Sequence, residues 1–412
     1  MTVVEICDRC LRRLGVLAGE LEAMLEINSC ASNGSNEVGK VKKVEEEECI
    51  YCCGLFKRIP EVAEKIAEKL GNYELESIQT GCILRGSIKE IDRFFLESIF
   101  PDQSEDRLRK HSIKQEVNDF LAEFLSKTLN VRDARREEIG DATVTIDAET
   151  LEYSIRITPI YIYGRYIKRV RNIPQTRWIC SACNGRGCQV CGFSGKKYPT
   201  SVEELIGQTC VELTGAEDAI LHGAGREDVD ARMLGNGRPF ILEIVNPRIR
   251  KIDLRELERK VNESARGKVS VRFLGFAKPK HVPKLKTSKF RKKYRAVVEF
   301  DRPIDEKELK KALEELSYRT IEQFTPERVE HRRANILRKR KTYGINLLLH
   351  RGKKAVIEIE ADSGLYIKEL VSGDKGRTRP SLSEILNSPA RVVRLDVIGV
   401  LGGLKEFEKF EN

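Results

Sequence analysis

Apolar residues recur at helical spacing in several separate parts of the chain. Val62, Ile66 and Leu70 lie four residues apart behind Pro60, which predicts a helix that Pro60 opens and Gly71 closes. The same kind of spacing predicts helices over residues 104–129, 253–261 and 305–316, and a capping box predicts another that starts after Ser201.

Elsewhere apolar and polar residues alternate, which is typical of half-buried strands. Tyr153, Ile155 and Ile157 form the clearest such run. Further strands are expected around Val144 and Ile146 and over residues 240–245, 296–300, 347–349 and 356–359. Helices and strands occur together throughout, so we expect a mixed α/β fold of the α+β kind.

Changes in composition along the chain predict three parts. Residues 1–58 carry paired cysteines and include a polar stretch, 28–48, that reads as a loop or insertion. Residues 59–157 form a block of helices and strands that we expect to be a separate α+β domain. From residue 158 aromatic and basic residues interleave, and a third part, residues 158–412, begins.

Charge narrows the class of partner. The formal net charge is +10, and residues 271–350 hold 22 Lys and Arg against 10 Asp and Glu, so this window accounts for the whole excess. A polyanionic partner is the natural inference, with a solvated basic face as the alternative. The stretches 284–295 and 331–341 are expected to contact phosphates, the second through Arg332, Arg333, Arg338, Lys339 and Arg340.

No apolar run reaches the roughly 18 residues that a membrane span needs, and the first residues show no secretory signal. We therefore expect a cytoplasmic protein that does not bind membranes. In a reducing compartment the 12 cysteines argue for metal sites rather than disulfides.

Two cysteine pairs in the N-terminal part have the spacing of zinc ligands. Cys7 and Cys10 form one pair and Cys49 and Cys52 the other, each with two residues between its members. This spacing lets both sulfurs of a turn reach one ion. A structural zinc is expected here, although Cys53 leaves the register of the second pair open.

A second cysteine cluster follows at Cys180, Cys183, Cys188 and Cys191. Its two pairs flank a short glycine-containing turn, so all four sulfurs can close around one tetrahedral ion. Zinc is expected, and the spacing leaves an iron–sulfur cluster open as an alternative.

The segment around Asp228 combines carboxylates, arginines and glycines. Gly225, Arg226, Glu227 and Asp228 follow one another, and Asp230 lies close by. Glycines let a backbone approach a ligand closely, and arginines keep a neighbouring carboxylate ionised. From these residues alone, an ordinary salt-bridged loop is the stronger interpretation.

The run Gly225-Arg-Glu-Asp228 resembles the Gly-Arg-x-Asp signature of pseudouridine synthases, in which the Asp is the nucleophile. The longer segment 224–247 is similar to the tenth family of these enzymes, a family of archaea and animals that modifies the T-loop of tRNA. Segments 163–168, 171–178 and 201–206 fit the same family, in its order. The resemblance covers roughly residues 158–400 and extends to the N-terminal cysteine pairs.

This resemblance implies a tRNA pseudouridine synthase that acts on the T-arm, at tRNA position 54, 55 or both, without a catalytic cofactor. It implies that Asp228 is the nucleophile, that Tyr294 packs on the target base, that Lys368 pairs with Asp228 and that Arg226 contacts the substrate. It also implies a zinc ion beside a THUMP-type RNA-binding domain over residues 59–157, and a catalytic domain built on a mostly antiparallel mixed sheet. Attack at C1′ or at C6 stays open.

Two other functions fit parts of the sequence. An RNA-binding or RNA-chaperone protein without catalysis shares the basic window and the cysteine pairs, but does not require Asp228, Tyr294 and Lys368 to meet. A THUMP-bearing RNA thiolase would instead use the cluster from Cys180 to Cys191 for sulfur chemistry.

Overall fold

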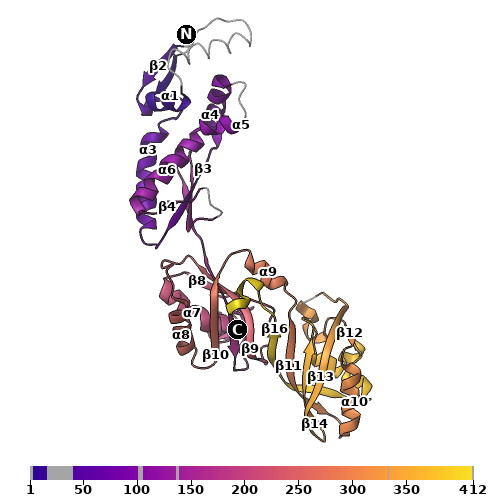
Figure 1. Cartoon of the computed structure of the whole chain (residues 1–412). Coiled ribbons are helices and arrows are strands. Elements are labelled where there is room, and N and C mark those ends of the chain that lie inside the picture. The colour runs from indigo at the N-terminus through magenta and orange to yellow at the C-terminus, as the bar shows by residue number, and fades with distance from the viewer. Residues whose placement is uncertain (1–2, 16–39, 101–104, 136–138, 333, 411–412) are drawn as a thin grey trace. The chain divides into compact units, whose positions relative to one another are not determined.

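The computed structural model describes residues 3–15, 40–100, 105–135, 139–332 and 334–410 (Figure 1). The chain forms two compact units: Met1–Pro159 with Asn246–Arg250, and Ile160–Val245 with Lys251–Asn412. The division of the sequence into parts at residues 58 and 157, and the THUMP-like character of the second part, stay predictions.

The first unit combines a small two-stranded sheet with a four-stranded sheet covered by helices. Its strand order is β4-β3-β5-β6, in which β3 pairs in parallel with β4 and β5, and β5 pairs antiparallel with β6. The strands are β3 (Ser77–Ile83), β4 (Arg132–Asp133), β5 (Ala142–Asp147) and β6 (Tyr153–Ile157). The helices are α1 (Asp8–Leu14), η1 (Glu46–Glu48), α3 (Leu55–Leu70), α4 (Gly86–Ile99), α5 (Glu105–Lys110) and α6 (Ile113–Leu129).

The prediction that Pro60 opens a helix is wrong in its start. Helix α3 begins five residues earlier, at Leu55, and Pro60 lies inside it. Leu55, Phe56 and Ile59 are buried in the core of this unit. Their burial outweighs the single backbone hydrogen bond that the proline cannot donate.

The prediction of one helix over residues 104–129 is also wrong, because two helices, α5 and α6, share this region. Ser112 ends the continuity: its backbone is extended, and its side-chain oxygen accepts from the backbone N–H of Gln115 at 3.2 Å. A capping serine of this kind starts a new helix rather than continuing the old one.

The polar stretch 28–48 is only partly a loop. Residues 28–39 lie outside the described residues. Lys40–Val44 forms β2, which pairs in parallel with β1 (Val3–Cys7). Val41 and Val44 pack against the core of this unit, a burial that the polar surroundings masked in the sequence.

The second unit is built on one ten-stranded sheet of order β10-β7-β9-β16-β11-β14-β13-β12-β15, with β8 paired to β9. Every described pairing in it is antiparallel except that of β16 with β9. This confirms the expected mixed, mostly antiparallel sheet. The strands are β7 (Ile160–Lys168), β8 (Asp218–Gly223), β9 (Arg232–Val245), β10 (Val269–Ala277), β11 (Arg291–Phe300), β12 (Thr320–Gln323), β13 (Arg338–Arg351), β14 (Lys354–Ala361), β15 (Thr378–Arg379) and β16 (Ala390–Leu401).

Helices flank this sheet, as predicted. Figure 1 shows α7 and α8 beside the strands β8 and β10, and α10 beside β12 and β13. The helix start after Ser201 is confirmed, and Ser201 caps it by accepting from the backbone N–H of Glu204 at 3.2 Å. The helices are α7 (Val202–Thr214), η2 (Gln189–Cys191), α8 (Leu254–Ser264), α9 (His281–Thr287), α10 (Glu306–Leu316), η3 (Glu327–Arg332), α11 (Ile367–Ser372), η4 (Asp374–Gly376), α12 (Leu382–Ile385) and η5 (Lys405–Phe410).

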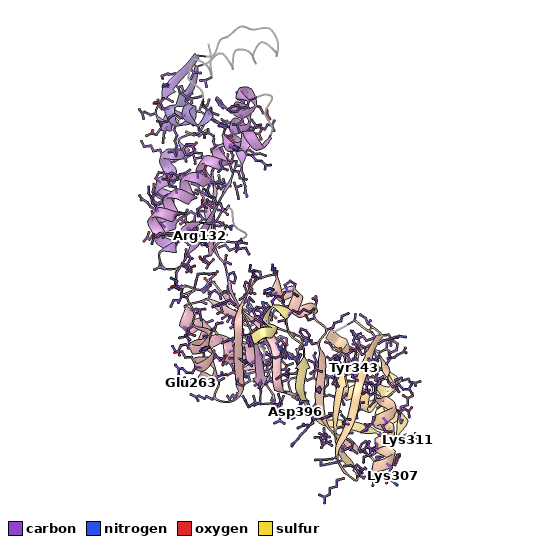
Figure 2. The ribbon with its side chains drawn as sticks, in the orientation of Figure 1. Arg132, Glu263, Lys307, Lys311, Tyr343 and Asp396 are labelled. Carbon is purple, nitrogen blue, oxygen red and sulfur yellow. The ribbon has the colours of Figure 1, made fainter. Side chains whose placement is uncertain are left out.

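The parallel contact between β9 and β16 joins the two halves of the sheet. Asp396, labelled in Figure 2, lies on β16 opposite Arg232. Its carboxylate pairs with the guanidinium groups of Arg232 and Arg171, each at 2.6 Å. These ion pairs hold the start of β9, and therefore the end of the loop that carries Asp228.

A candidate active site around Asp228

The loop between β8 and β9 carries the Gly-Arg-x-Asp run. Gly225 has a φ of +75°, in the left-handed region that favours glycine. Two residues later the side chain of Glu227 is buried, whereas that of Asp228 is 39% exposed. Neighbouring side chains in this loop therefore have opposite environments.

Glu227 anchors the loop inside the unit. Its carboxylate accepts from Nε of Arg238 and from the hydroxyl of Tyr166, each at 2.9 Å. Nζ of Lys168 lies 3.8 Å away, and all three partners are fully buried. A buried carboxylate needs such partners, because an unpaired charge inside a protein is strongly disfavoured.

Lys168 also holds the backbone of the loop. Its Nζ donates to the carbonyl oxygens of Ile173 at 3.0 Å, Val229 at 3.3 Å and Asp228 at 3.4 Å. Burial lowers the pKa of Lys168, while the charge of Glu227 opposes that shift. Lys168 thus fixes the main chain at Asp228 through backbone carbonyls, which leaves the Asp228 carboxylate available to a substrate.

Two cations reach the same oxygen of Asp228. NH1 of Arg328 lies 3.3 Å from Oδ2, and Nζ of Lys368 lies 3.4 Å from it. Nε of Arg328 in turn binds Glu369 at 2.6 Å, and the Glu369 side chain is 5% exposed. The carboxylates of Asp228 and Glu369 thus hold Arg328 between them.

Lys368 is shared between two carboxylates. It lies closer to Asp230, at 2.9 Å, than to Asp228. Burial works to raise the pKa of Asp230, but the hydrogen bond and charge of Lys368 prevail and lower it. The lysine therefore braces the loop at two points.

Asp228 opens into a cavity of about 780 Å³ that Tyr294, Lys368 and Arg226 also line. Tyr294 is 8% exposed, and burial, the largest cause, raises the pKa of its hydroxyl to about 12. The phenol is therefore protonated at neutral pH. Trp178 and Gln175, from the predicted family segment 171–178, line the same cavity. The volume is in the range of pockets that enclose a small ring system.

The basic residues predicted to contact RNA are spread over β13 and the segment before it. Arg333 lies outside the described residues, and Arg332 ends η3. Arg338 donates to Thr325 at 2.7 Å, Arg340 donates to the carbonyl of Ser363 at 2.9 Å, and Lys339 pairs with Glu322 at 2.7 Å. Arg226 is exposed.

The other basic stretch, 284–295, contains a residue that faces inward. Alternation along β11 leaves Arg291, Lys293 and Arg295 exposed and buries Lys292. The outward residues pair with acidic residues of the neighbouring β14, as Arg295 does with Glu358. Lys292 lines the cavity instead of the basic face, a difference that strand pairing decides.

The four N-terminal cysteines come together. The sulfur atoms of Cys7, Cys10, Cys49 and Cys52 all lie within 4.8 Å of one another. Two of the separations are 3.8 and 4.0 Å, close to the roughly 3.8 Å edge of a tetrahedron with metal–sulfur bonds of about 2.3 Å. Cys53 is exposed and does not belong to the tetrad, which resolves the register.

The second cysteine cluster forms another such tetrad in the other unit. Sulfur separations of 3.8 and 3.9 Å again match a single tetrahedral ion. Backbone N–H groups of Gly187 and Gly195 point at the sulfurs of Cys183 and Cys191 at 3.2 and 3.3 Å. Such donors complement the negative charge of metal-bound thiolates. Both tetrads have the geometry to hold a metal ion.

Sequence patterns did not reveal three residues of the site. Arg328 lies in the basic window without a motif of its own, and Glu369 follows Lys368 with no role predicted for it. Lys292 read as part of a basic surface. Only Lys292 left a usable signal, since it stands two positions before Tyr294 and shares its face of a strand.

The chain is similar in sequence to known proteins. Residues 161–400, more than half of the chain, match the family profile described as "Pus10, C-terminal". The tRNA pseudouridine synthase Pus10 of Archaeoglobus fulgidus is 48% identical over 355 residues, which cover 86% of this chain and 95% of that protein. The enzyme of the same name from Methanothermobacter marburgensis is 41% identical over 407 residues, 97% of this chain and 96% of that protein.

Among solved structures, a Cbf5-Nop10-Gar1 complex matches with a TM-score of 0.30 and 16% identity over 57% of this chain and 47% of that chain. The sequence matches define the class, which is that of the pseudouridine synthases. Within this class the chain belongs to the Pus10 family of tRNA pseudouridine synthases. None of the described helices is long and apolar enough to cross a membrane.

Proposed function

We propose that this chain converts one or two T-loop uridines of tRNA to pseudouridine, with Asp228 as the nucleophile. The observation that carries the proposal is the pair of cations on Oδ2 of Asp228, from Arg328 at 3.3 Å and Lys368 at 3.4 Å. A carboxylate nucleophile must be ionised and aimed, and two fixed cations beside it do both.

The reaction is an isomerisation. The bond from C1′ of the ribose to N1 of the uracil breaks, the ring turns, and a bond from C1′ to C5 forms. A proton leaves C5 and another is gained at N1, so no electrons are exchanged with an outside group. The reaction therefore needs no redox cofactor, and the residues of the cavity supply positioning and charge.

The target base must leave its stack to reach Asp228. Unstacking costs a few kcal/mol, which stacking on an aromatic ring and phosphate contacts offset. Tyr294 lines the cavity together with Asp228 and offers a ring face for the uracil. Because its pKa is raised to about 12, its hydroxyl also keeps a proton to donate.

The T-arm is the proposed partner of the basic residues. Lys339, Arg340 and the exposed Arg226 lie on the same unit as the cavity, and we propose that they contact phosphates near the target nucleotide. Such contacts make tRNA binding fall steeply with salt concentration. A cytoplasmic location agrees with a tRNA substrate and is part of the proposal.

We propose zinc at both cysteine tetrads, in structural roles. Four-sulfur tetrahedral sites are closed and leave no open position for a substrate. In the first unit the tetrad ties the β1–α1 segment to the segment before α3.

Two rival functions are less favoured. A non-catalytic RNA chaperone does not require Asp228, Tyr294 and Lys368 to share one cavity, yet all three line it. A thiolase would need a cysteine in its cavity, and none of the described residues that line this one is a cysteine.

The test is incubation with an unmodified tRNA transcript, followed by mapping of pseudouridine. We expect product in the T-loop from the wild-type protein and none from Asp228→Ala. Asp230→Ala, which removes a carboxylate two residues away, should still form product, although more slowly. Absence of product with the wild type, or product with Asp228→Ala, would contradict the proposal.

A further inference from the structure

Lys292 is a buried lysine that the roles described so far leave unexplained. Its side chain lies on β11, on the same face as Tyr294, and is 7% exposed. Within the described part of the chain, no hydrogen bond or ion pair engages its Nζ, although the group lines the cavity. Burial, together with the charge of Arg238, lowers the pKa of Lys292 to about 7, and Glu227 opposes this shift.

A second buried cation, Arg238, lines the same cavity. The residue is fully buried, and its Nε and NH1 donate to Glu227 and to the carbonyl of Ala224. Its NH2 has no hydrogen-bond partner among the described residues. A buried donor left unpaired costs free energy and calls for an explanation.

Gly225 lies close to both cations. A Cβ atom placed on Gly225 would lie 3.1 Å from Nζ of Lys292 and 3.5 Å from NH1 of Arg238. The absence of a side chain at this position keeps the space beside both groups open. We call Lys292 and Arg238 the cationic subsite; it lines the cavity into which Asp228 opens, three residues along the loop from Gly225.

We propose that the cationic subsite binds a carbonyl oxygen of the target uracil and stabilises the negative charge on the ring while it is detached from the ribose. The inference rests on the proposed function, and it assigns to Lys292 a direct contact with the reacting base.

The position beside Tyr294 favours a base over a phosphate at this subsite. Among the described residues, six lysines and arginines line the cavity together with the carboxylates of Asp228, Asp230 and Glu227, so charge by itself does not select between the two. A uracil carbonyl is neutral at the start and needs only a hydrogen-bond donor. A base that stacks on Tyr294 has its edge within reach of the residue two positions earlier on the same strand face.

The chemistry requires such a group only during reaction. When the bond between C1′ and N1 breaks, both electrons of that bond stay on the ring, and the negative charge spreads to the carbonyl oxygens. When C5 bonds to C1′ and loses its proton, N1 gains a proton and the ring is neutral again. An N–H donor at the oxygen therefore binds the detached ring more tightly than the starting base, which raises the rate constant.

The test compares Lys292→Met with the wild type on unmodified tRNA. We expect the single-turnover rate constant at saturating tRNA to fall by about 10²-fold, as for the loss of one preorganised donor, while the Kd for tRNA does not change. The melting temperature should stay the same or rise, since methionine replaces a buried unpaired charge. Lys292→Arg should recover part of the rate, and Lys354→Met, which removes an exposed lysine of β14, should behave as wild type.

A second arm identifies the contact chemically. A target uridine with sulfur in place of O2 or O4 accepts a hydrogen bond poorly, so one of these substrates should slow the wild type but not slow Lys292→Met further. Equal slowing of both proteins, or an unchanged rate constant for Lys292→Met, would overturn the subsite. A weaker tRNA affinity with a smaller salt dependence would assign Lys292 to a phosphate and also overturn it. A wild type that makes no pseudouridine would instead defeat the proposed function itself.

Discussion

The guanidinium of Arg328 lies 3.3 Å from the carboxylate of Asp228, and its other edge binds Glu369 at 2.6 Å. Arg328 belongs to η3, whereas Glu369 belongs to α11, so two separate elements meet at the candidate nucleophile. Lys368 reaches the same oxygen from α11. Asp228 therefore has two cationic partners where the sequence predicted one.

The first prediction concerns this pair of cations. Arg328→Met and Lys368→Met should each lower the single-turnover rate constant about tenfold, because solvent screens contacts to a half-exposed carboxylate. The double variant should lose more than either single variant, since each cation compensates for loss of the other. Rate measurements at saturating tRNA check this expectation.

Glu369→Gln is the control for positioning. It leaves Arg328 in the chain but weakens the contact that holds its guanidinium, so a smaller loss than that of Arg328→Met is expected. If Arg328→Met reacts at the wild-type rate, the arginine has no part in orienting Asp228.

The second prediction follows from the titration of Lys292. Its pKa is about 7 in the folded protein and 10.5 without the perturbation, with Arg238 and Glu227 as the charged groups that act on it. Between pH 7 and pH 10.5, Lys292 is protonated in the unfolded chain but mostly neutral in the folded protein. Over this range its contribution to the free energy of unfolding therefore rises with pH by about 1.4 kcal/mol per unit. Below pH 7 this gain is absent.

Urea unfolding of wild type and Lys292→Met from pH 6 to about 10 measures the effect. The free energy of unfolding of the wild type should rise relative to that of Lys292→Met as pH rises through this range. Comparison of the two proteins cancels the other titrating groups. A difference that stays constant with pH would contradict the buried, unpaired state of Lys292.

The third prediction concerns the buried cluster below the loop. Glu227→Gln removes the anion that Arg238 and Lys168 share inside the unit. Loss of one partner from a buried ion pair costs about 3–5 kcal/mol, so the melting temperature should fall clearly. Glu358→Gln, which breaks the exposed pair with Arg295, should cost no more than about 1 kcal/mol. Similar melting temperatures for the two variants would show that the cluster adds little stability.

The fourth prediction separates two neighbouring cysteines. Cys52→Ser should lower the bound zinc by one equivalent per chain and destabilise the first unit, because Cys52 belongs to the tetrad. Cys53→Ser should change neither, because Cys53 is exposed and lies outside it. Metal analysis of the purified variants, with thermal unfolding alongside, decides the matter. Equal zinc content in the wild type, Cys52→Ser and Cys53→Ser would show that the N-terminal tetrad binds no zinc.

The sequence predicted local features well where a single physical cause controls them. Capping by Ser201, the alternation of Tyr153 to Ile157 and the amphipathic helix after Asp305 all depend on near neighbours, and each is present in the structure. It failed at the start of α3 before Pro60, which depends on packing against residues far along the chain. It also missed the break at Ser112, a local cap within a run of apolar residues at helical spacing.

The Gly-Arg-x-Asp run marked Asp228, and the cysteine spacing marked both tetrads, because these signals are contained in short segments. The partners of Asp228 are different in kind. Arg328 comes from η3, before β13, and Lys368 from α11, after β14, while Lys292 faces inward through its place on the paired strand β11. Charge alone placed Arg328 and Lys292 in a basic window, whereas the family resemblance implied Lys368. The pairing of strands decided that Lys292 faces the cavity, since a strand side chain has only two faces to choose between.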